Sequence, residues 1–158
     1  NSDVVISNEA IRDKDGREVN VLGYGEIYTF ETTVEFNCSS ADVAFGLEFK
    51  NIKGVVITSV ESALLHKLER TISEVKAGSV FKVRCDFECL FTADTYLVNF
   101  GVSSFTHGQE VLNRIIDLYM FKVEQLQPYS SGMIQLVGSM SVESDIWEKP
   151  RELIRDIS

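Results

Sequence analysis

Charged and amide side chains alternate with apolar ones along several stretches of the sequence, which would place them together on one solvent-facing side of a sheet. Carboxylate, amide and guanidinium groups are the donors and acceptors that the hydroxyl groups of a sugar require. Among them, Arg84 suits a carboxylate or phosphate, because a guanidinium forms two parallel hydrogen bonds with such a group. The alternative is an ordinary solvated sheet face. The predicted site consists of one row and its expected neighbours: Lys82, Arg84, Asp86, Glu88, Glu48, Lys50 and Asn99.

Patterns typical of catalysis are weak in this sequence. Glu31 and Glu35 would lie two pleats apart on one strand face, as a pair of glycosidase carboxylates could, but a solvated strand gives the same pattern. The two histidines, His66 and His107, have no second ligand at metal-binding spacing. The sequence has no nucleophile elbow and no phosphate-binding loop. Catalysis is therefore the less favoured hypothesis, and no metal or cofactor is expected.

The chain has three cysteines, Cys38, Cys85 and Cys89, so at least one thiol must stay unpaired. If Cys85 and Cys89 lie on one strand, they are about 13 Å apart, which is beyond the reach of a disulfide. We therefore predict three reduced thiols, which favours a cytoplasmic location.

Composition excludes several classes of protein. The 158 residues include 15 Lys plus Arg and 24 Asp plus Glu, for a formal net charge of −9. Such a chain repels phosphate backbones and anionic membrane surfaces, so nucleic-acid binding is not expected. No stretch approaches the roughly 20 apolar residues of a membrane-spanning helix.

The dominant hydrophobic period is two, which is typical of strands with one buried face. It is clearest over 28–36, 43–49 and 81–91, and weaker strands are expected over 4–11, 18–22, 55–61, 96–105, 118–124 and 133–142. Turn residues such as those at 13–16 separate them. The pattern predicts an all-β fold, a two-sheet antiparallel β-sandwich of the jelly-roll or immunoglobulin-like kind, filling residues 1–158 as a single domain.

Two segments depart from the strand pattern. Residues 63–75 place apolar side chains at near-helical spacing, so they are expected as a short helix or an irregular crossover. The tail 144–158 contains Pro150 where a helix would start, and it is expected as a short helix.

Five motifs, in order along residues 3 to 143, resemble the C-terminal carbohydrate-binding domain of Wzt, the nucleotide-binding subunit of ABC transporters that export O-antigen polysaccharide. The first is a strand with an Asp-x-x-Gly hairpin, the second a Gly-Glu strand entry, and the others are strand-and-turn or closing segments. They span Ile6–Gly16, Gly25–Phe30, Phe45–Gly54, Ala93–Val102, and Phe121–Val123 followed by Gly132–Ile134.

The resemblance implies a non-catalytic module that recognises the capped non-reducing end of an O-antigen polysaccharide and couples it to export. The implied partners are the polysaccharide and, through an ATPase domain expected upstream of Asn1, the transmembrane subunit of the transporter. The location implied is the cytoplasmic side of the bacterial inner membrane. A protein–protein adaptor on the same sandwich, and a small glycosidase, are the alternative functions.

The resemblance also implies a homodimer. The apolar stretch 133–142 follows the hinge-like segment 128–132, and such a strand left at a sheet edge is an open template for pairing. Exchange of this strand between two copies is the predicted arrangement, and an ordinary intramolecular edge strand is the alternative.

Overall fold

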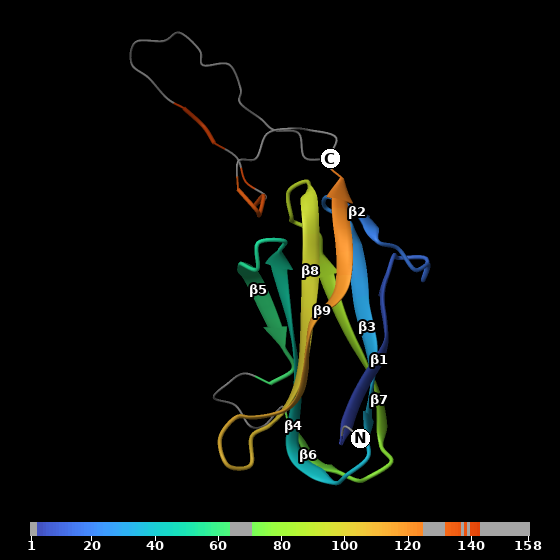
Figure 1. Ribbon diagram of the computed structural model, residues 1–158. Coiled ribbons are helices and arrows are strands. Elements are labelled where there is room, and N and C mark those ends of the chain that lie inside the picture. The colour runs from blue at the N-terminus through green and yellow to red at the C-terminus, as the bar shows by residue number, and fades with distance from the viewer. Residues whose placement is uncertain (1–2, 64–70, 125–131, 137, 139, 143–158) are drawn as a thin grey trace.

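The structure is a computed structural model that describes residues 3–63, 71–124, 132–136, 138 and 140–142. Nine strands are found within these residues (Figure 1). They are β1 (Val4–Arg12), β2 (Val21–Gly23), β3 (Ile27–Phe36), β4 (Ser40–Asn51), β5 (Val56–Glu61), β6 (Ile72–Val75), β7 (Val80–Glu88), β8 (Asp94–Ser104) and β9 (Glu110–Glu124). Among the described residues there is no helix that is long and apolar enough to cross a membrane.

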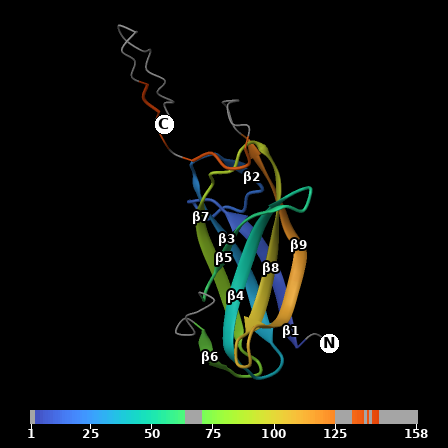
Figure 2. The same ribbon diagram turned by 90° about the vertical axis from the view of Figure 1, so that its left-hand side faces the viewer.

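The strands form two facing sheets, which confirms the predicted all-β sandwich (Figure 2). The small sheet has the order β1-β3-β7, and the large sheet has the order β2-β9-β8-β4-β5, with β6 also paired to β4. The pairs are antiparallel except that the short β2 runs parallel to β9. The sandwich therefore offers two outer faces, one on each sheet, for binding.

The core lies between the sheets and is rich in aromatic side chains. The predicted alternation holds on the central strands: Leu47 and Phe49 of β4 and Phe100 of β8 are buried. Phe49 joins the two sheets, because its ring lies 4.9 Å from that of Phe87 on β7 and 5.9 Å from that of Phe121 on β9. Burial of these rings is the main stabilising contribution to the sandwich.

Two of the expected segments differ from the structure. The helical alternative for 63–75 is wrong at its end, because Ile72–Val75 forms β6 and pairs with Ser40–Val43 of β4. The strand expected over 118–124 is much longer and begins at Glu110. The register between β9 and β8 is irregular, so the first half of β9 does not follow a two-residue hydrophobic period. The sequence pattern therefore did not predict this half of the strand.

The described part of 133–142 forms no regular strand. Ile134 makes an isolated bridge with Phe91, and the backbone N–H groups of Thr92 and Gln135 donate to Met133 and Leu90. The helix expected over 144–158 lies outside the described residues.

All three cysteines are free thiols, as predicted from their number and spacing. Cys89 is fully buried just after β7, and burial raises the pKa of its thiol to about 11. This thiol is therefore protonated and unreactive at neutral pH, as expected for a core cysteine.

Candidate functional site: a groove over two facing glycines

Two glycines lie side by side at the centre of the large sheet. Gly46 of β4 and Gly101 of β8 are register partners, and their outward positions carry no side chain. Neither backbone requires glycine, because an added Cβ would be in ordinary van der Waals contact, 3.5 Å from Glu61 Cγ at Gly46 and 3.6 Å from Arg114 Cγ at Gly101. The glycines therefore open space above the sheet, as glycine inside a strand does where a ligand approaches the backbone.

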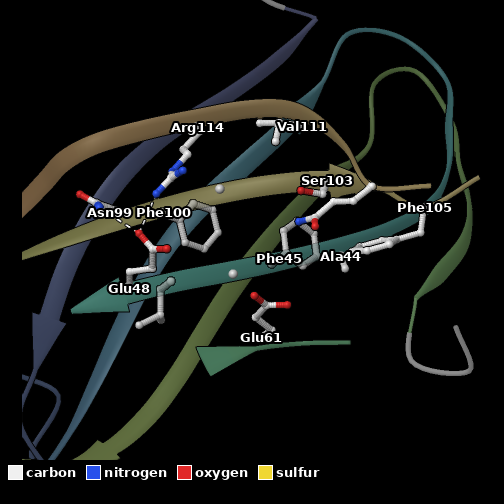
Figure 3. Close-up of a pocket in the computed structure, with 14 residues that line it drawn as sticks. Ala44, Phe45, Glu48, Glu61, Asn99, Phe100, Ser103, Phe105, Val111 and Arg114 are labelled. Carbon is white, nitrogen blue, oxygen red and sulfur yellow. Dashed lines mark hydrogen bonds and ion pairs between the residues drawn. The ribbon is translucent and has the colours of Figure 1, made fainter. Parts of the chain in front are cut away.

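This space is a groove along the outer face of the large sheet, which we call the β4–β8 groove (Figure 3). Its floor is the backbone of β4 and β8, and its walls come from side chains of β4, β5, β8, β9 and the segment between β8 and β9. The wall residues are Glu48, Glu61, Asn99, Ser103, Phe105, Gln109, Val111 and Arg114. The groove thus combines carboxylate, amide, hydroxyl and guanidinium groups with the aromatic rings of Phe45, Phe100 and Phe105.

The polar wall at one end of the groove is held by a hydrogen-bond network. Glu48 accepts from Asn99 Nδ2 at 3.0 Å and from Arg114 Nη2 at 2.7 Å. Asn99 is 4% exposed, and its Oδ1 accepts the backbone N–H of Asp117 at 3.0 Å. Since a charge-assisted hydrogen bond is short and directional, Arg114 is fixed with further N–H groups left for a ligand.

An irregularity in β9 completes this network. The register of β9 shifts opposite Asn99, and Asp117 adopts a positive φ of 58°. This conformation brings the carboxylate of Asp117 to 2.5 Å from Lys50 Nζ, whose side chain is only 11% exposed. Backbone strain of this kind persists where the surroundings enforce it, and it often occurs at binding sites.

Glu61 forms the wall on the β5 side and is exposed. Within the part of the chain that the structure describes, no hydrogen bond or ion pair to its carboxylate is recorded. Its oxygens are therefore available to accept hydrogen bonds from a ligand in the groove.

The structure divides the seven predicted site residues between the two sheets. Glu48 and Asn99 line the groove and Lys50 lies beside it, whereas the row on β7 lies on the outer face of the small sheet. The expectation that the two sets are neighbours is wrong, because β7 pairs with β3 and not with β4 or β8. The β7 row consists of Lys82, Arg84, Asp86 and Glu88.

The sequence pattern did not indicate the glycine pair or six of the eight wall residues, which are Glu61, Ser103, Phe105, Gln109, Val111 and Arg114. A signal was present, since a glycine in the middle of each of two strand patterns is unusual. Their facing register could not be obtained from the pattern, and neither could the long first half of β9 that carries Arg114.

Glu31 lies on the outer face of the small sheet, and its side chain is 5% exposed. Arg12 Nε is 2.6 Å from its Oε1, Arg84 Nε is 3.4 Å from Oε2, and Lys82 Nζ is 3.7 Å from Oε1. The hydrogen bond from Arg12, followed by the nearby positive charges, lowers the pKa of Glu31. A glycosidase general acid needs a raised pKa, so Glu31 does not suit that role.

Acid should weaken the fold through Glu31. Because its folded pKa lies below the ordinary value of 4.5, its ion pairs contribute stability that is complete above that pH and is lost as the pH falls through the lowered pKa. We expect urea unfolding to show a smaller loss of stability for Glu31→Gln than for the unaltered chain between about pH 5 and pH 3. Equal losses in both proteins would contradict this role of Glu31.

The groove and the sandwich can be compared with known proteins. The sequence profile of the family described as Wzt C-terminal domain matches residues 1–136. No curated protein matches the chain. A crystal structure of the C-terminal domain of Wzt is similar to this chain with a TM-score of 0.79 and 21% identity, covering 90% of this chain and 86% of that one.

Two further solved structures share less with the chain. A Pseudomonas fluorescens alkylpurine DNA glycosylase, AlkC, bound to DNA with an abasic-site analogue, aligns with a TM-score of 0.49 and 14% identity over 77% of this chain and 30% of that one. The CARDB domain of a Pyrococcus furiosus protein, in complex with di-metal ions, aligns with a TM-score of 0.45 and 10% identity over 80% and 98%. Neither likeness bears on function. The profile match covers most of the sequence and the Wzt structure shares its fold, so the chain belongs to the Wzt C-terminal domain family.

Proposed function

We propose that this chain is a carbohydrate-binding module that holds an O-antigen polysaccharide in the β4–β8 groove and couples it to export by an ABC transporter. The family is that of a non-catalytic C-terminal domain, so the role is binding and not turnover. The observation that carries the proposal is the strip without side chains over Gly46 and Gly101. Sugar rings can lie on this strip while their hydroxyl groups meet the polar walls.

The walls supply the chemistry that a sugar needs. Arg114 donates, Glu61 accepts, and Gln109 and Ser103 can do both. Phe105 offers an apolar surface to the C–H groups of a sugar ring. A groove open along the sheet suits a chain of sugars better than a single small molecule.

The finer proposal is that the module recognises the capped non-reducing end of the polysaccharide. It rests on membership of the family and on the resemblance in the sequence motifs. The same membership supports a place at the cytoplasmic side of the inner membrane, with the transmembrane subunit reached through an ATPase domain. Sugar binding by the β7 row, on the other outer face, stays a prediction.

Substitution in the walls tests the proposal. A hydrogen bond to a charged group contributes about 1.5–3 kcal/mol, so Arg114→Ala and Glu61→Ala should each weaken binding by about tenfold or more. The measurement is isothermal titration with O-polysaccharide fragments of the source organism, one with the native non-reducing end and one without its cap. Lys122→Ala, which removes an exposed cation from β9 outside the groove, is the control.

Three outcomes decide the proposal. Tighter binding of the capped fragment, lost in both wall variants and kept in Lys122→Ala, supports both its coarse and its fine forms. Equal affinity for the two fragments rules out recognition of the cap but is still consistent with sugar binding in the groove. Unchanged affinity in both wall variants, with the fold intact, rules out the groove as the site.

We also propose that the domain is a homodimer formed through residues 133–142. Support comes from the way Met133 and Gln135 pair with the loop after β7, since the same hydrogen bonds could form between two copies if this segment were exchanged. Light scattering at micromolar concentration should report about twice the 17.8 kDa chain mass, and deletion from Met133 onward should abolish the dimer. A stable monomer for the whole chain would contradict this arrangement.

A further inference from the structure

The outer face of the small sheet carries a second concave site, in which cations gather. Four of the 15 Lys and Arg residues of this acidic chain line one hollow over β1, β3 and β7. They are Arg12, Lys14, Lys82 and Arg84, and we call this site the cationic hollow. Such a concentration of positive charge is unexpected in a chain whose formal net charge is −9.

The cations exceed what the buried carboxylate of Glu31 requires. One negative charge faces three cations, and Arg12 alone already makes a 2.6 Å contact with Glu31. Glu31 and its three cations therefore have a formal charge of +2, and with Lys14, Asp13 and Asp86 the lining of the whole hollow carries a formal charge of +1. Its cations remain open to water, with side-chain exposures of 38% for Arg12, 49% for Lys82 and 59% for Arg84.

The direction of the guanidinium contacts matters for what the hollow can bind. Arg12 and Arg84 both approach Glu31 through Nε, which leaves their terminal Nη groups for other partners. Arg12 Nη1 donates to the carbonyl of Gly16 at 3.1 Å. Within the described residues, no partner is recorded for either Nη group of Arg84. Glu31 thus orients two guanidinium groups without occupying the donors that face the solvent.

Two other carboxylates line the hollow, and both already have hydrogen-bond donors. Asp86 accepts from the hydroxyl of Thr29 at 2.6 Å. Asp13 accepts from the backbone N–H groups of Asp15 and Arg17 in the turn after β1. These contacts hold the two carboxylates to their own neighbours and leave Arg84 and Lys82 as the groups with spare donors.

We propose that the cationic hollow binds a phosphate group, with Arg84 and Lys82 as its principal ligands. A phosphate monoester carries about −1.5 to −2 charges at pH 7 and three strong acceptor oxygens, so it can accept hydrogen bonds from Arg84 and Lys82 at the same time. The terminal N–H groups of a guanidinium fit two phosphate oxygens at once, and the ammonium adds a point charge. This site goes beyond the proposed sugar groove, since it lies on the other sheet and reads a charge and not a sugar ring.

Titration with inorganic phosphate tests the proposal. Amide chemical shifts of the whole chain are followed by NMR at low ionic strength, with sodium chloride at matched ionic strength as the control for general screening. We expect saturable shifts on β3 and β7. Arg84→Ala and Lys82→Ala should each weaken phosphate binding at least fivefold, and Lys122→Ala, which removes the same charge from β9, should leave it unchanged.

Arg84→Lys keeps the positive charge but lacks the two parallel N–H groups of the guanidinium. It should therefore bind phosphate more tightly than Arg84→Ala and more weakly than the unaltered chain. Glucose 6-phosphate and glucose identify the source of the phosphate. Tighter binding of glucose 6-phosphate than of inorganic phosphate assigns a phosphate carried on a sugar, equal binding assigns the free anion, and glucose alone should not bind in the hollow.

The proposal is overturned if phosphate causes no saturable change in the amide chemical shifts. It is also overturned if Lys82→Ala and Lys122→Ala lose the same amount of phosphate affinity. In either case the cations serve only to stabilise Glu31. The sugar groove is judged separately, by the binding of oligosaccharide to the Lys82→Ala variant. If phosphate does not bind but oligosaccharide does, only the proposed phosphate site is ruled out. If phosphate binds but oligosaccharide does not, only the proposed sugar groove is ruled out.

Discussion

Filling the groove should abolish oligosaccharide binding while leaving the fold intact. In Gly101→Val the new side chain would occupy the floor of the β4–β8 groove, where sugar rings are proposed to lie. We expect the affinity for the capped fragment to fall by more than about tenfold, equivalent to at least about 1.4 kcal/mol of binding free energy. Gly46→Val should have the same effect from the neighbouring strand, because the two glycines face each other.

Neither substitution should destabilise the chain. An added Cβ would lie 3.5 Å from Glu61 Cγ and 3.9 Å from the Val60 carbonyl oxygen at Gly46, and 3.6 Å from Arg114 Cγ and 3.7 Å from the Asn113 carbonyl oxygen at Gly101, all ordinary contact distances. Valine is favoured over glycine inside strands by up to about 1 kcal/mol, so the free energy of unfolding should stay level or rise. Thr95→Val, an outward position on β8 outside the groove, is the matched control and should bind normally. Normal binding by both glycine variants would show that the bare strip does not hold the ligand.

Truncation of Phe49 should have the largest effect on stability. Its side chain is 1% exposed and contacts rings from both sheets, so Phe49→Ala leaves a cavity where they meet. We expect a loss of about 3–5 kcal/mol in the free energy of unfolding, measured by urea denaturation. That loss is a large part of the roughly 5–15 kcal/mol that holds a typical domain folded.

The control for this change is an apolar residue on the surface. Ile52 is 61% exposed in the turn after β4, and Ile52→Ala should change the free energy of unfolding by no more than about 0.5 kcal/mol. A similar small loss in both variants would mean that Phe49 does not join the sheets as described.

The sequence was sufficient for the fold wherever the alternation of side chains is regular. On β4 and β7 the two-residue period correctly predicted both the strands and their inward faces. It failed on the first half of β9, because the register shifts between β9 and β8 interrupt the alternation of inward and outward side chains. It also failed at β6, a strand of only four residues that is too short to show a period.

The candidate site was harder to predict, for a different physical reason. Alternation tells which side of a strand meets water, but it does not tell which strands are neighbours. Arg84 and Glu48 are both on outer faces as expected, yet they belong to different sheets. The groove depends on register, since Gly46 and Gly101 act together only because pairing places them opposite each other across 55 residues of sequence.

The measurement that tests the central proposal most directly is NMR mapping of the capped oligosaccharide on the unaltered chain. Binding in the groove predicts that the largest shifts fall on the amides of Gly46, Gly101 and Arg114 and on Glu61 of the edge strand. Shifts concentrated instead on β3 and β7 would place the sugar on the small sheet and contradict the assignment of the β4–β8 groove.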